Sequence, residues 1–226
     1  ELQIIKRNFQ VGDETVHALR GISFTIYEGE FVTIMGTSGS GKSTLLKTMG
    51  CLDTPTSGEY LLDGVSVRTM SKPQRAVLRN RKIGFVFQNY ALFRYMTVFD
   101  NIAFGLKIQK KDKKYIKERV SELVELIGLK GLEKRYPSQL SGGQRQRVAF
   151  ARALAPNPQK LHLHAPFAAI DAKERKEIRS WLREMIEKLG VTSIFVTHDQ
   201  DEAIEVADEI IITNKGRIEQ TGTPIE

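Results

Sequence analysis

The chain has little of what marks secreted, membrane-spanning or fibrous proteins. A single cysteine, Cys51, stands among its 226 residues, so a disulfide framework is excluded and a reducing compartment suits the chain. No run approaches the ~18 consecutive apolar residues that a membrane span needs, and no basic-then-apolar leader opens the sequence. Internal repeats and low-complexity linkers are lacking as well. The sequence therefore predicts a cytoplasmic protein that neither spans a membrane nor is secreted.

Composition and charge exclude fewer classes of protein than these absences do. Hydrophobic residues make up 41% and charged residues 27% of the chain, which is ordinary for a globular protein of one large or two small domains. The formal net charge of +7 suits nucleic acid, an anionic membrane surface or a phosphate-rich ligand. The densest basic run, residues 107–119, holds one aromatic residue, Tyr115, and leads into a helical apolar pattern. We interpret the run as a solvated helix face and expect no nucleic acid partner.

Alternating strand and helix patterns predict a mostly parallel sheet. Apolar runs of strand length recur with helical segments between them, at residues 31–35, 83–87, 161–163, 193–196 and 209–213. Other segments look like antiparallel strands, at residues 2–9, 16–27 and 60–67, with turns at Gly12-Asp13 and Asp63-Gly64. We therefore expect a small antiparallel β layer beside the main sheet.

A helical segment interrupts this alternation. Between about residues 89 and 155 the sequence becomes helical and charged, with breaks at Gly128, Gly131 and Pro137. Strand patterns resume only after this segment. We expect residues 89–155 to form a helical subdomain inserted into the α/β core.

A glycine-rich loop joins the first predicted parallel strand to a helical run at residues 44–49. Residues 36–43 read GTSGSGKS and match the pattern G-x-x-x-x-G-K-[ST]. The glycines let backbone N–H groups converge on phosphate oxygens, and the following helix points its positive end at the same anion. Lys42 would contact the β- and γ-phosphates of ATP, and the Ser43 hydroxyl would ligate Mg²⁺. The predicted ATP-binding residues of this loop are Gly36, Thr37, Ser38, Gly39, Ser40, Gly41, Lys42, Ser43 and Thr44.

A second glycine pair opens another predicted helix. Residues 140–144 read LSGGQ and run directly into a helical stretch, so Ser141 is a natural N-cap and the glycines expose backbone donors. A single nucleotide has little use for two such anion sites in one small domain. In a dimer, each site could contact a phosphate from a different direction, so both sites would be occupied. The predicted residues that bind ATP across this dimer are Ser141, Gly142, Gly143 and Gln144.

The stretch LSGGQRQRVAFARAL resembles the signature helix of the nucleotide-binding domains of ABC transporters. The resemblance covers essentially the whole chain. It implies an α/β fold with a P-loop NTPase core, a mostly parallel sheet, an antiparallel β subdomain and an inserted helical subdomain. It also implies one nucleotide-binding domain over residues 1–226, without a C-terminal regulatory domain, and head-to-tail dimers with two ATP molecules between the subunits.

Further site residues follow from the resemblance, position by position. Phe9 occupies the place of the aromatic residue that stacks on adenine, with Val16 nearby. Gln88 resembles the glutamine that contacts Mg²⁺ and faces the membrane partner. Asp171 resembles the aspartate that communicates across the dimer. His198, at the end of a predicted strand, resembles the histidine that reaches the γ-phosphate. The resemblance thus predicts Gln88, Asp171 and His198 as catalytic residues, and Ser43 and Gln88 as Mg²⁺ ligands.

The sequence departs from the family pattern at residues 161–171, which read LHLHAPFAAID. His164 stands where the family has the aspartate that holds the water shell of Mg²⁺, and imidazole replaces it poorly because Mg²⁺ prefers anionic oxygen ligands. Ala165 replaces the glutamate that acts as general base, a role worth ~10²–10⁴-fold in rate. We expect nucleotide binding to persist and hydrolysis to be severely impaired. His162 and His164 share a strand face, which is also typical of a transition-metal site, but no third ligand can be placed.

The combined prediction is the ATP-binding motor subunit of an ABC transporter, with ATP and Mg²⁺ as cofactors. It would pair as a homodimer or with a second ATPase subunit, and would bind a transmembrane permease at the inner face of the cell membrane. Residues 87–106 and the region after LSGGQ resemble sulfate, maltose and polyamine importers, whereas residues 16–64 resemble lipoprotein-release and macrolide-efflux ATPases. Importer ATPases of that group usually continue into a regulatory β domain, so we expect the chain to be a shortened form.

Two alternatives remain at this stage. The first is a catalytically silent subunit that uses ATP to hold a dimer together beside an active partner. The second is a soluble ABC protein that works on nucleic acid or ribosomes. The second is disfavoured because such proteins carry two nucleotide domains in one chain or a long coiled coil, and neither pattern is present here.

Overall fold

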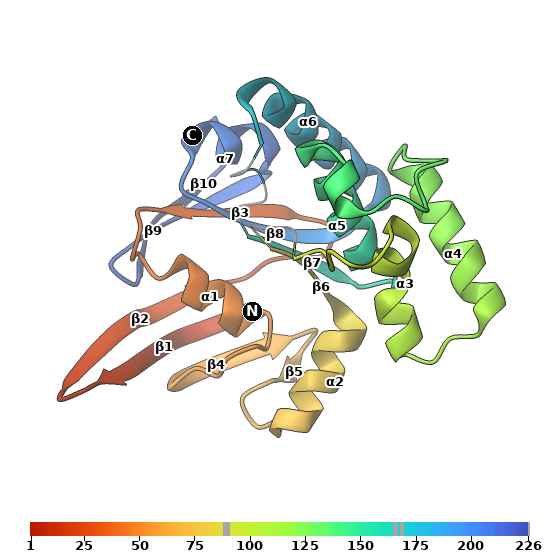
Figure 1. Ribbon diagram of the computed structural model, residues 1–226. Coiled ribbons are helices and arrows are strands. Elements are labelled where there is room, and N and C mark those ends of the chain that lie inside the picture. Colours follow the sequence, from red (N-terminus) through yellow and green to blue (C-terminus); the bar gives the residue numbers. More distant parts are fainter. Residues whose placement is uncertain (88–90, 165–166, 168–169, 226) are drawn as a thin grey trace.

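The computed structural model describes residues 1–87, 91–164, 167 and 170–225, and within them it forms two sheets with helices around them (Figure 1). One sheet has the strand order β2-β1-β4-β5 and the other β10-β9-β3-β8-β7-β6. Helix α1 (Lys42–Met49) lies between the two sheets, and α6 (Ala172–Leu189) and α7 (Gln200–Val206) cover the opposite face of the larger sheet. The α/β class predicted from the sequence is confirmed.

The larger sheet is parallel except at one edge. Its strands are β3 (Phe31–Gly36), β6 (Ile83–Val86), β7 (Lys160–His164), β8 (Thr192–Thr197), β9 (Glu209–Asn214) and β10 (Arg217–Gly222). The first five pair in parallel, as their apolar runs predict, whereas β10 returns antiparallel beside β9. Strand β10 was not predicted, because its alternating exposed residues carry no apolar run. The parallel strands end at one edge, where ligands of open α/β sheets bind.

The smaller sheet is antiparallel, as predicted. It consists of β1 (Leu2–Val11), β2 (Glu14–Phe24), β4 (Ser57–Leu62) and β5 (Val65–Ser66). The β1–β2 hairpin turns at Gly12-Asp13 and the β4–β5 hairpin at Asp63-Gly64, which confirms both predicted turns. Apolar side chains of β1, β2, β3 and α1 form one buried cluster between the sheets, including Ile5, Leu19, Ile34 and Leu45. This cluster fixes the β1–β2 hairpin relative to α1.

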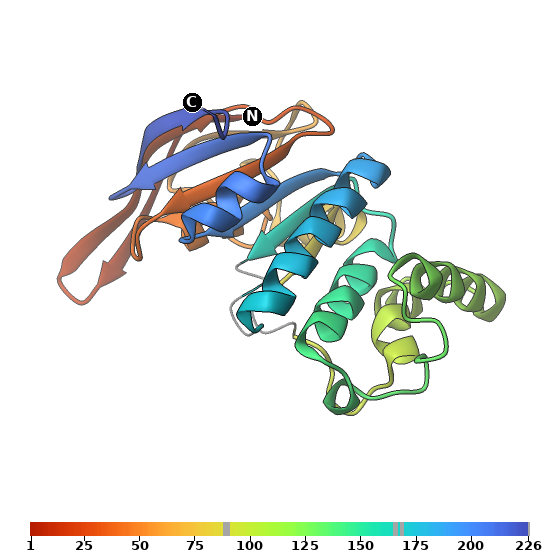
Figure 2. The same ribbon diagram turned by 90° about the horizontal axis from the view of Figure 1, so that it is seen from above.

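The helical part of the chain lies between β6 and β7, where the sequence predicts it (Figure 2). Its helices are α3 (Val98–Ile108), α4 (Lys113–Leu126), the 3-10 turn η1 (Pro137–Gln139) and α5 (Gly142–Leu154). The remaining helix, α2 (Lys72–Lys82), precedes β6 and was not predicted. Helices α3, α4 and α5 share a buried cluster that continues into the parallel sheet.

The basic run at residues 107–119 spans the end of α3 and the first turns of α4. Most of its side chains are exposed, and Ile116 points into the core. The solvated helix face predicted for this run is confirmed. Among the described residues, no helix combines the length and the apolar character that crossing a membrane would need.

Candidate nucleotide-binding site

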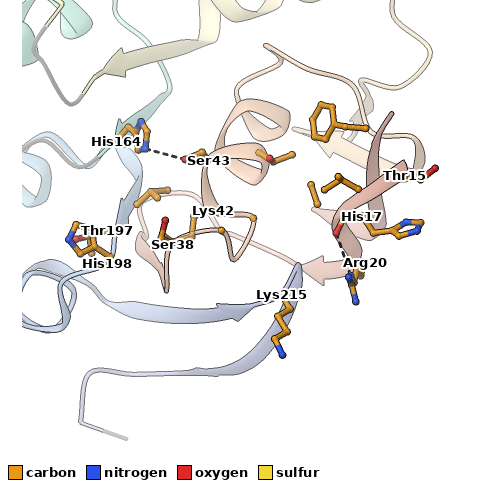
Figure 3. A pocket seen from close by; sticks show the side chains of 17 residues that line it. Thr15, His17, Arg20, Ser38, Lys42, Ser43, His164, Thr197, His198 and Lys215 are labelled. Atoms are coloured by element: carbon orange, nitrogen blue, oxygen red, sulfur yellow. Dashed lines mark hydrogen bonds between the residues drawn. The ribbon is translucent and has the colours of Figure 1, made fainter. Parts of the chain in front are cut away.

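An open cleft of about 740 Å³ lies where the parallel strands end, beside the β1–β2 hairpin. The loop after β3 and the start of α1 line the cleft, with residues at the ends of β7 and β8 on one side and Lys215, near Arg20, on the other (Figure 3). The lining brings together half of the site residues predicted from the sequence, namely Phe9, Val16, Ser38, Gly39, Gly41, Lys42, Ser43, Thr44, His164 and His198. Residues more than 180 positions apart in the chain thus meet in one cavity.

The loop between β3 and α1 has the backbone that anion binding needs. Gly41 is the N-cap of α1 with a φ of 97°, a left-handed conformation that favours glycine, and no described side chain caps this helix. The first N–H groups of α1 therefore point into the cleft with the positive end of the helix dipole. Gly36 is required for a different reason: a Cβ there would collide with the Thr213 carbonyl oxygen and the Ser40 hydroxyl. Ser40 is itself buried, with its Oγ 3.0 Å from Thr213 Oγ1.

Lys42 is folded back onto its own loop. Its Nζ donates to the carbonyl oxygens of Gly36, at 2.5 Å, and Thr37, at 2.6 Å. Burial lowers the pKa of this ammonium. A phosphate in the cleft would offer the Nζ ammonium an acceptor of opposite charge in place of two neutral carbonyls, which adds a direct attraction between the two charges. The arrangement is that of a phosphate-binding lysine held close to its ligand site.

The hairpin supplies an aromatic wall. Phe9 and Val16 are partners across β1 and β2, and both side chains are partly exposed, at 37% and 47%. The guanidinium of Arg7 lies 4.4 Å from the centre of the Phe9 ring and so occupies one of its faces. An aromatic ring anchored in this way beside the loop suits stacking on a flat base.

The corner where the sequence predicts Mg²⁺ binding holds a hydroxyl and an imidazole. Ser43 Oγ on α1 and His164 Nε2 at the end of β7 lie 3.4 Å apart (Figure 3). The pKa of His164 is lowered, first by burial and then by the charges of Lys47 and Lys42. The described residues that line the cleft include no carboxylate, and the described part of the chain holds no cluster of three His, Cys, Asp or Glu side chains that could bind a metal.

The described residues of this corner supply only one ligand of the kind that Mg²⁺ prefers. The ion takes hard oxygen ligands, usually one or two carboxylates with substrate phosphates, and it gives up water reluctantly. Ser43 supplies one suitable oxygen, while His164 supplies a nitrogen with two lysines close to it. Gln88 and Ala165, which the sequence also assigns to this part of the site, lie outside the described residues.

His162, two residues before His164, is buried in the core rather than placed in the cleft. It is 1% exposed and packs edge-on against Phe85, with ring centroids 5.4 Å apart. Neither ring nitrogen forms a hydrogen bond of normal geometry with a described residue, although the backbone of Leu46 lies near enough to raise the pKa slightly. Burial and then the Lys160 charge outweigh this and lower the pKa of His162 to about 3. The imidazole is therefore neutral in the folded protein and cannot reach a cation in the cleft.

The other predicted catalytic residues differ in what surrounds them. His198 follows β8, is exposed and lines the cleft with Thr197 (Figure 3). Asp171 caps α6, where its Oδ1 accepts from the N–H groups of Lys173, at 3.1 Å, and Glu174, at 3.0 Å. Asp171 thus has a local structural role in this chain.

The LSGGQ segment lies apart from the cleft, at a separate small hollow of about 210 Å³. Ser141 caps α5, as predicted, and Gly142 is the first residue of the helix. Ser141 also forms a capping box with Gln144, which was not predicted. One oxygen of Glu174 accepts hydrogen bonds from Ser141 Oγ and from the N–H of Gly143, both at 2.8 Å. A carboxylate of α6 therefore occupies the anion site that the two glycines create. Sequence reasoning missed Glu174 because 31 residues separate it from Gly143 and no local pattern marks the contact.

A phosphate-binding loop at the end of a parallel strand, an aromatic hairpin beside it and an LSGGQ helix on an inserted helical region define an ATP-binding cassette. The model of the ABC transporter family matches residues 19–168, which is more than half of the chain. The chain belongs to this family.

Individual relatives point to one branch of the family. The chain is 51% identical over 225 residues to a sulfate/thiosulfate import ATP-binding protein, CysA, of Synechococcus elongatus, and 50% identical over 229 residues to CysA of Acinetobacter baylyi. Each alignment covers 100% of this chain and 63% of the relative, so the chain spans less than two thirds of the length of these proteins. The predicted resemblance to sulfate importer ATPases is confirmed, whereas the resemblance of residues 16–64 to efflux ATPases stays a prediction.

Solved structures agree with the fold. The ATP-binding cassette MJ0796, in a dimeric post-hydrolysis state bound to ADP and Pi, is 36% identical with a TM-score of 0.87, and the match covers 99% of this chain and 97% of that one. The protein cbiO1 of Clostridium perfringens, part of the ABC transporter complex cbiONQ, is 34% identical with a TM-score of 0.87 and coverages of 99% and 90%. Both support the cassette architecture of the chain.

Proposed function

We propose that the chain binds ATP in the cleft and acts as the ATP-binding subunit of an importer. The observation that carries this proposal is the uncapped N-terminus of α1, which opens into the cleft beside Lys42 and the exposed ring of Phe9. The loop would bind the phosphates of ATP, Lys42 would turn from its two carbonyls to the β- and γ-phosphates, and Phe9 with Val16 would pack against adenine. His198 would lie at the γ-phosphate end.

The subunit would act as a dimer, either with a second copy or with a related ATPase. Support comes from the LSGGQ segment, whose donors hold a carboxylate oxygen at a hollow separate from the cleft of the same chain. In a head-to-tail dimer Ser141, Gly142, Gly143 and Gln144 would bind the γ-phosphate held by the partner, and Glu174 would have to move off these donors first. Asp171, which anchors the same turn of α6, would then lie at the interface, in keeping with the role the family resemblance implies.

The names of the relatives support sulfate or thiosulfate import as the process that this subunit serves. The chain would lie at the inner face of the cell membrane, bound to a transmembrane permease through its helical region, residues 89–155. We propose residues 1–226 as a single nucleotide-binding domain.

Hydrolysis would be slow in this chain, because Ala165 offers no proton acceptor and His164 no anionic oxygen. Mg²⁺ would bind to the phosphates of ATP and to Ser43, and by family resemblance Gln88 would be a further ligand. His164 would contribute little to binding of the ion. A silent subunit beside an active partner is the second candidate, favoured by the same two residues.

The test is ATP binding and turnover with Mg²⁺ in the purified chain and in the double variant His164→Asp, Ala165→Glu. We expect the parent to bind ATP and hydrolyse it slowly, and the double variant to gain about 10²-fold or more in turnover. The variant Lys42→Ala, in either background, should lose ATP binding. Normal turnover by the parent would contradict the impaired site. Restored turnover only after addition of a second ATPase subunit would favour the silent-subunit role.

A further inference from the structure

The aromatic wall of the cleft is supported from behind by a charged side chain. The guanidinium carbon of Arg7 lies 4.4 Å from the centre of the Phe9 ring. Phe9 lines the cleft, whereas Arg7 does not. The ring face that Arg7 covers is therefore turned away from the cleft, and the other face is left for a ligand.

Arg7 is itself held in place by a carboxylate. Its Nε donates to Asp53 Oδ2 at 2.8 Å, and its Nη2 donates to Asp53 Oδ1 at 2.9 Å. The two side chains are only 23% and 22% exposed. Two parallel hydrogen bonds fix the plane of a guanidinium, which a single bond to an ammonium would not do. The guanidinium of Arg7 is therefore a flat and fixed support for the ring.

Asp53 belongs to the segment that follows α1. Its N–H donates to the carbonyl oxygen of Lys47, in the last turn of α1, at 3.2 Å. Its Oδ1 also accepts from the N–H of Thr54 at 2.9 Å. The other end of the same helix opens into the cleft, where the phosphates would bind. The pair of Arg7 and Asp53 thus connects the aromatic wall to the helix of the phosphate loop.

This connection affects the base of a nucleotide and not its phosphates. An aromatic side chain loses rotational freedom when a base packs on it, and this loss lowers the affinity. A ring that Arg7 already holds has less freedom to lose, so more of the stacking energy contributes to binding. The phosphates would contact the loop and Lys42, where Arg7 plays no part.

We propose that Arg7, oriented by Asp53, is a positioning residue for the base of the nucleotide. It acts through Phe9 and holds the ring at a fixed place relative to the phosphate loop. The pair thereby sets how strongly the cleft prefers a nucleotide over a bare phosphate chain. This inference rests on the proposed binding of ATP in the cleft.

The experiment measures the affinity of the purified chain for ATP and for inorganic tripolyphosphate, both with Mg²⁺, in the parent and in Arg7→Met. Methionine keeps an unbranched side chain beside the ring but lacks the charge and the two donors. We expect the affinity for ATP to fall by about 3- to 10-fold and the affinity for tripolyphosphate to stay unchanged. Retained tripolyphosphate binding also shows that the variant is folded. Arg7→Lys, which keeps the charge but not the paired hydrogen bonds, should recover part of the ATP affinity.

Arg183→Met is the matched control. Arg183 Nη2 donates to Asp208 at 2.7 Å, and the guanidinium carbon lies 5.9 Å from the centre of the Phe31 ring. The control therefore removes a similar arrangement of arginine, carboxylate and ring, but none of these three residues lines the cleft. Both affinities should stay at the values of the parent.

A double-mutant cycle with Phe9→Ala separates positioning of the ring from other effects of Arg7. In the Phe9→Ala background, Arg7→Met should no longer change the affinity for ATP, because no ring remains to be held. An equal loss in both backgrounds, a parallel loss of tripolyphosphate affinity, or no loss at all would overturn this inference and leave the proposed function standing. Absence of ATP binding by the parent would overturn both.

Discussion

Replacing His162 by leucine should stabilise the protein, and more so at acidic pH. His162 is 1% exposed, lies in the centre of β7 and leaves both ring nitrogens without a normal hydrogen bond among the described residues. An unsatisfied buried polar group costs ~1–3 kcal/mol, and leucine of similar size would fill the site beside Phe85 with apolar atoms. At pH 7 we therefore expect His162→Leu to raise the free energy of unfolding by ~1–3 kcal/mol.

The pH dependence follows from the depressed pKa. In the unfolded chain the imidazole takes up a proton near its ordinary pKa of 6.5, whereas in the fold it stays neutral down to about pH 3. Below pH 6.5 the unfolded state binds the extra proton, so the parent loses stability as the pH falls towards the folded pKa. For one such group the loss between pH 7 and pH 5 is about 2 kcal/mol. His162→Leu removes this loss and should gain ~3–5 kcal/mol over the parent at pH 5.

Urea unfolding at pH 7 and pH 5 measures both effects. The single tryptophan, Trp181, packs against Phe150 in the core and reports unfolding by its fluorescence. The lowered pKa of His164 contributes equally to parent and variant and cancels in their difference. His17→Gln, at an exposed histidine of β2, is the matched control and should follow the parent at both pH values. Equal losses of stability in the parent and in His162→Leu would refute the claim that the fold keeps His162 uncharged.

Three further predictions concern the cleft and the signature segment. Phe9→Ala should weaken binding of a fluorescent ATP analogue by about 5- to 150-fold, because base stacking on an aromatic ring is worth ~1–3 kcal/mol. Tyr27→Ala, at an exposed ring outside the cleft lining, should leave the binding unchanged. Gly36→Ala should lower the free energy of unfolding by ~1–3 kcal/mol in the urea assay, because its Cβ has no room against Thr213; unchanged stability would mean that the loop relaxes freely. Glu174→Gln should strengthen ATP-driven dimerisation by about 5- to 30-fold in analytical ultracentrifugation. The substitution weakens the two charge-assisted hydrogen bonds to the LSGGQ donors, so these donors are more easily freed for the phosphate of the partner. Weaker dimerisation would show that Glu174 supports the interface instead.

The parts of the fold that could be predicted from the sequence are those with a local signal. The parallel strands have apolar runs, the hairpin turns have Gly12 and Gly64 with positive φ, and the LSGGQ helix begins at the serine expected to cap it. Strand β10 escaped prediction because it is an exposed edge strand that pairs only with β9. Helix α2 has no buried residue and therefore no apolar pattern, and its local signals are the capping box at Ser71, the proline in its first turn and the basic residues in its last turn.

The candidate site was predictable to the same extent. The loop residues and His198 follow from motif and position, and the structure brings them into one cleft. The distinction between His162 and His164 was not predictable, since both belong to one strand face. His162 is buried in the middle of β7, whereas His164 is its last residue and lines the cleft. The Glu174 contact depends on the packing of α6 beside α5, which the sequence does not encode in any short pattern.

Binding and chemistry are carried by different parts of this cleft, which explains how one can persist without the other. The groups that would hold phosphate are the backbone of the β3–α1 loop, the first turn of α1 and Lys42, and the fold itself positions them through Gly36 and Gly41. The groups that would organise the metal and the attacking water lie at the end of β7 and after it, where His164 Nε2 lies beside Ser43 and the described residues of the cleft lining include no carboxylate. Because the first set depends on backbone geometry and the second on individual side chains, we expect substitutions at the end of β7 to slow hydrolysis and to leave the phosphate-binding loop in place.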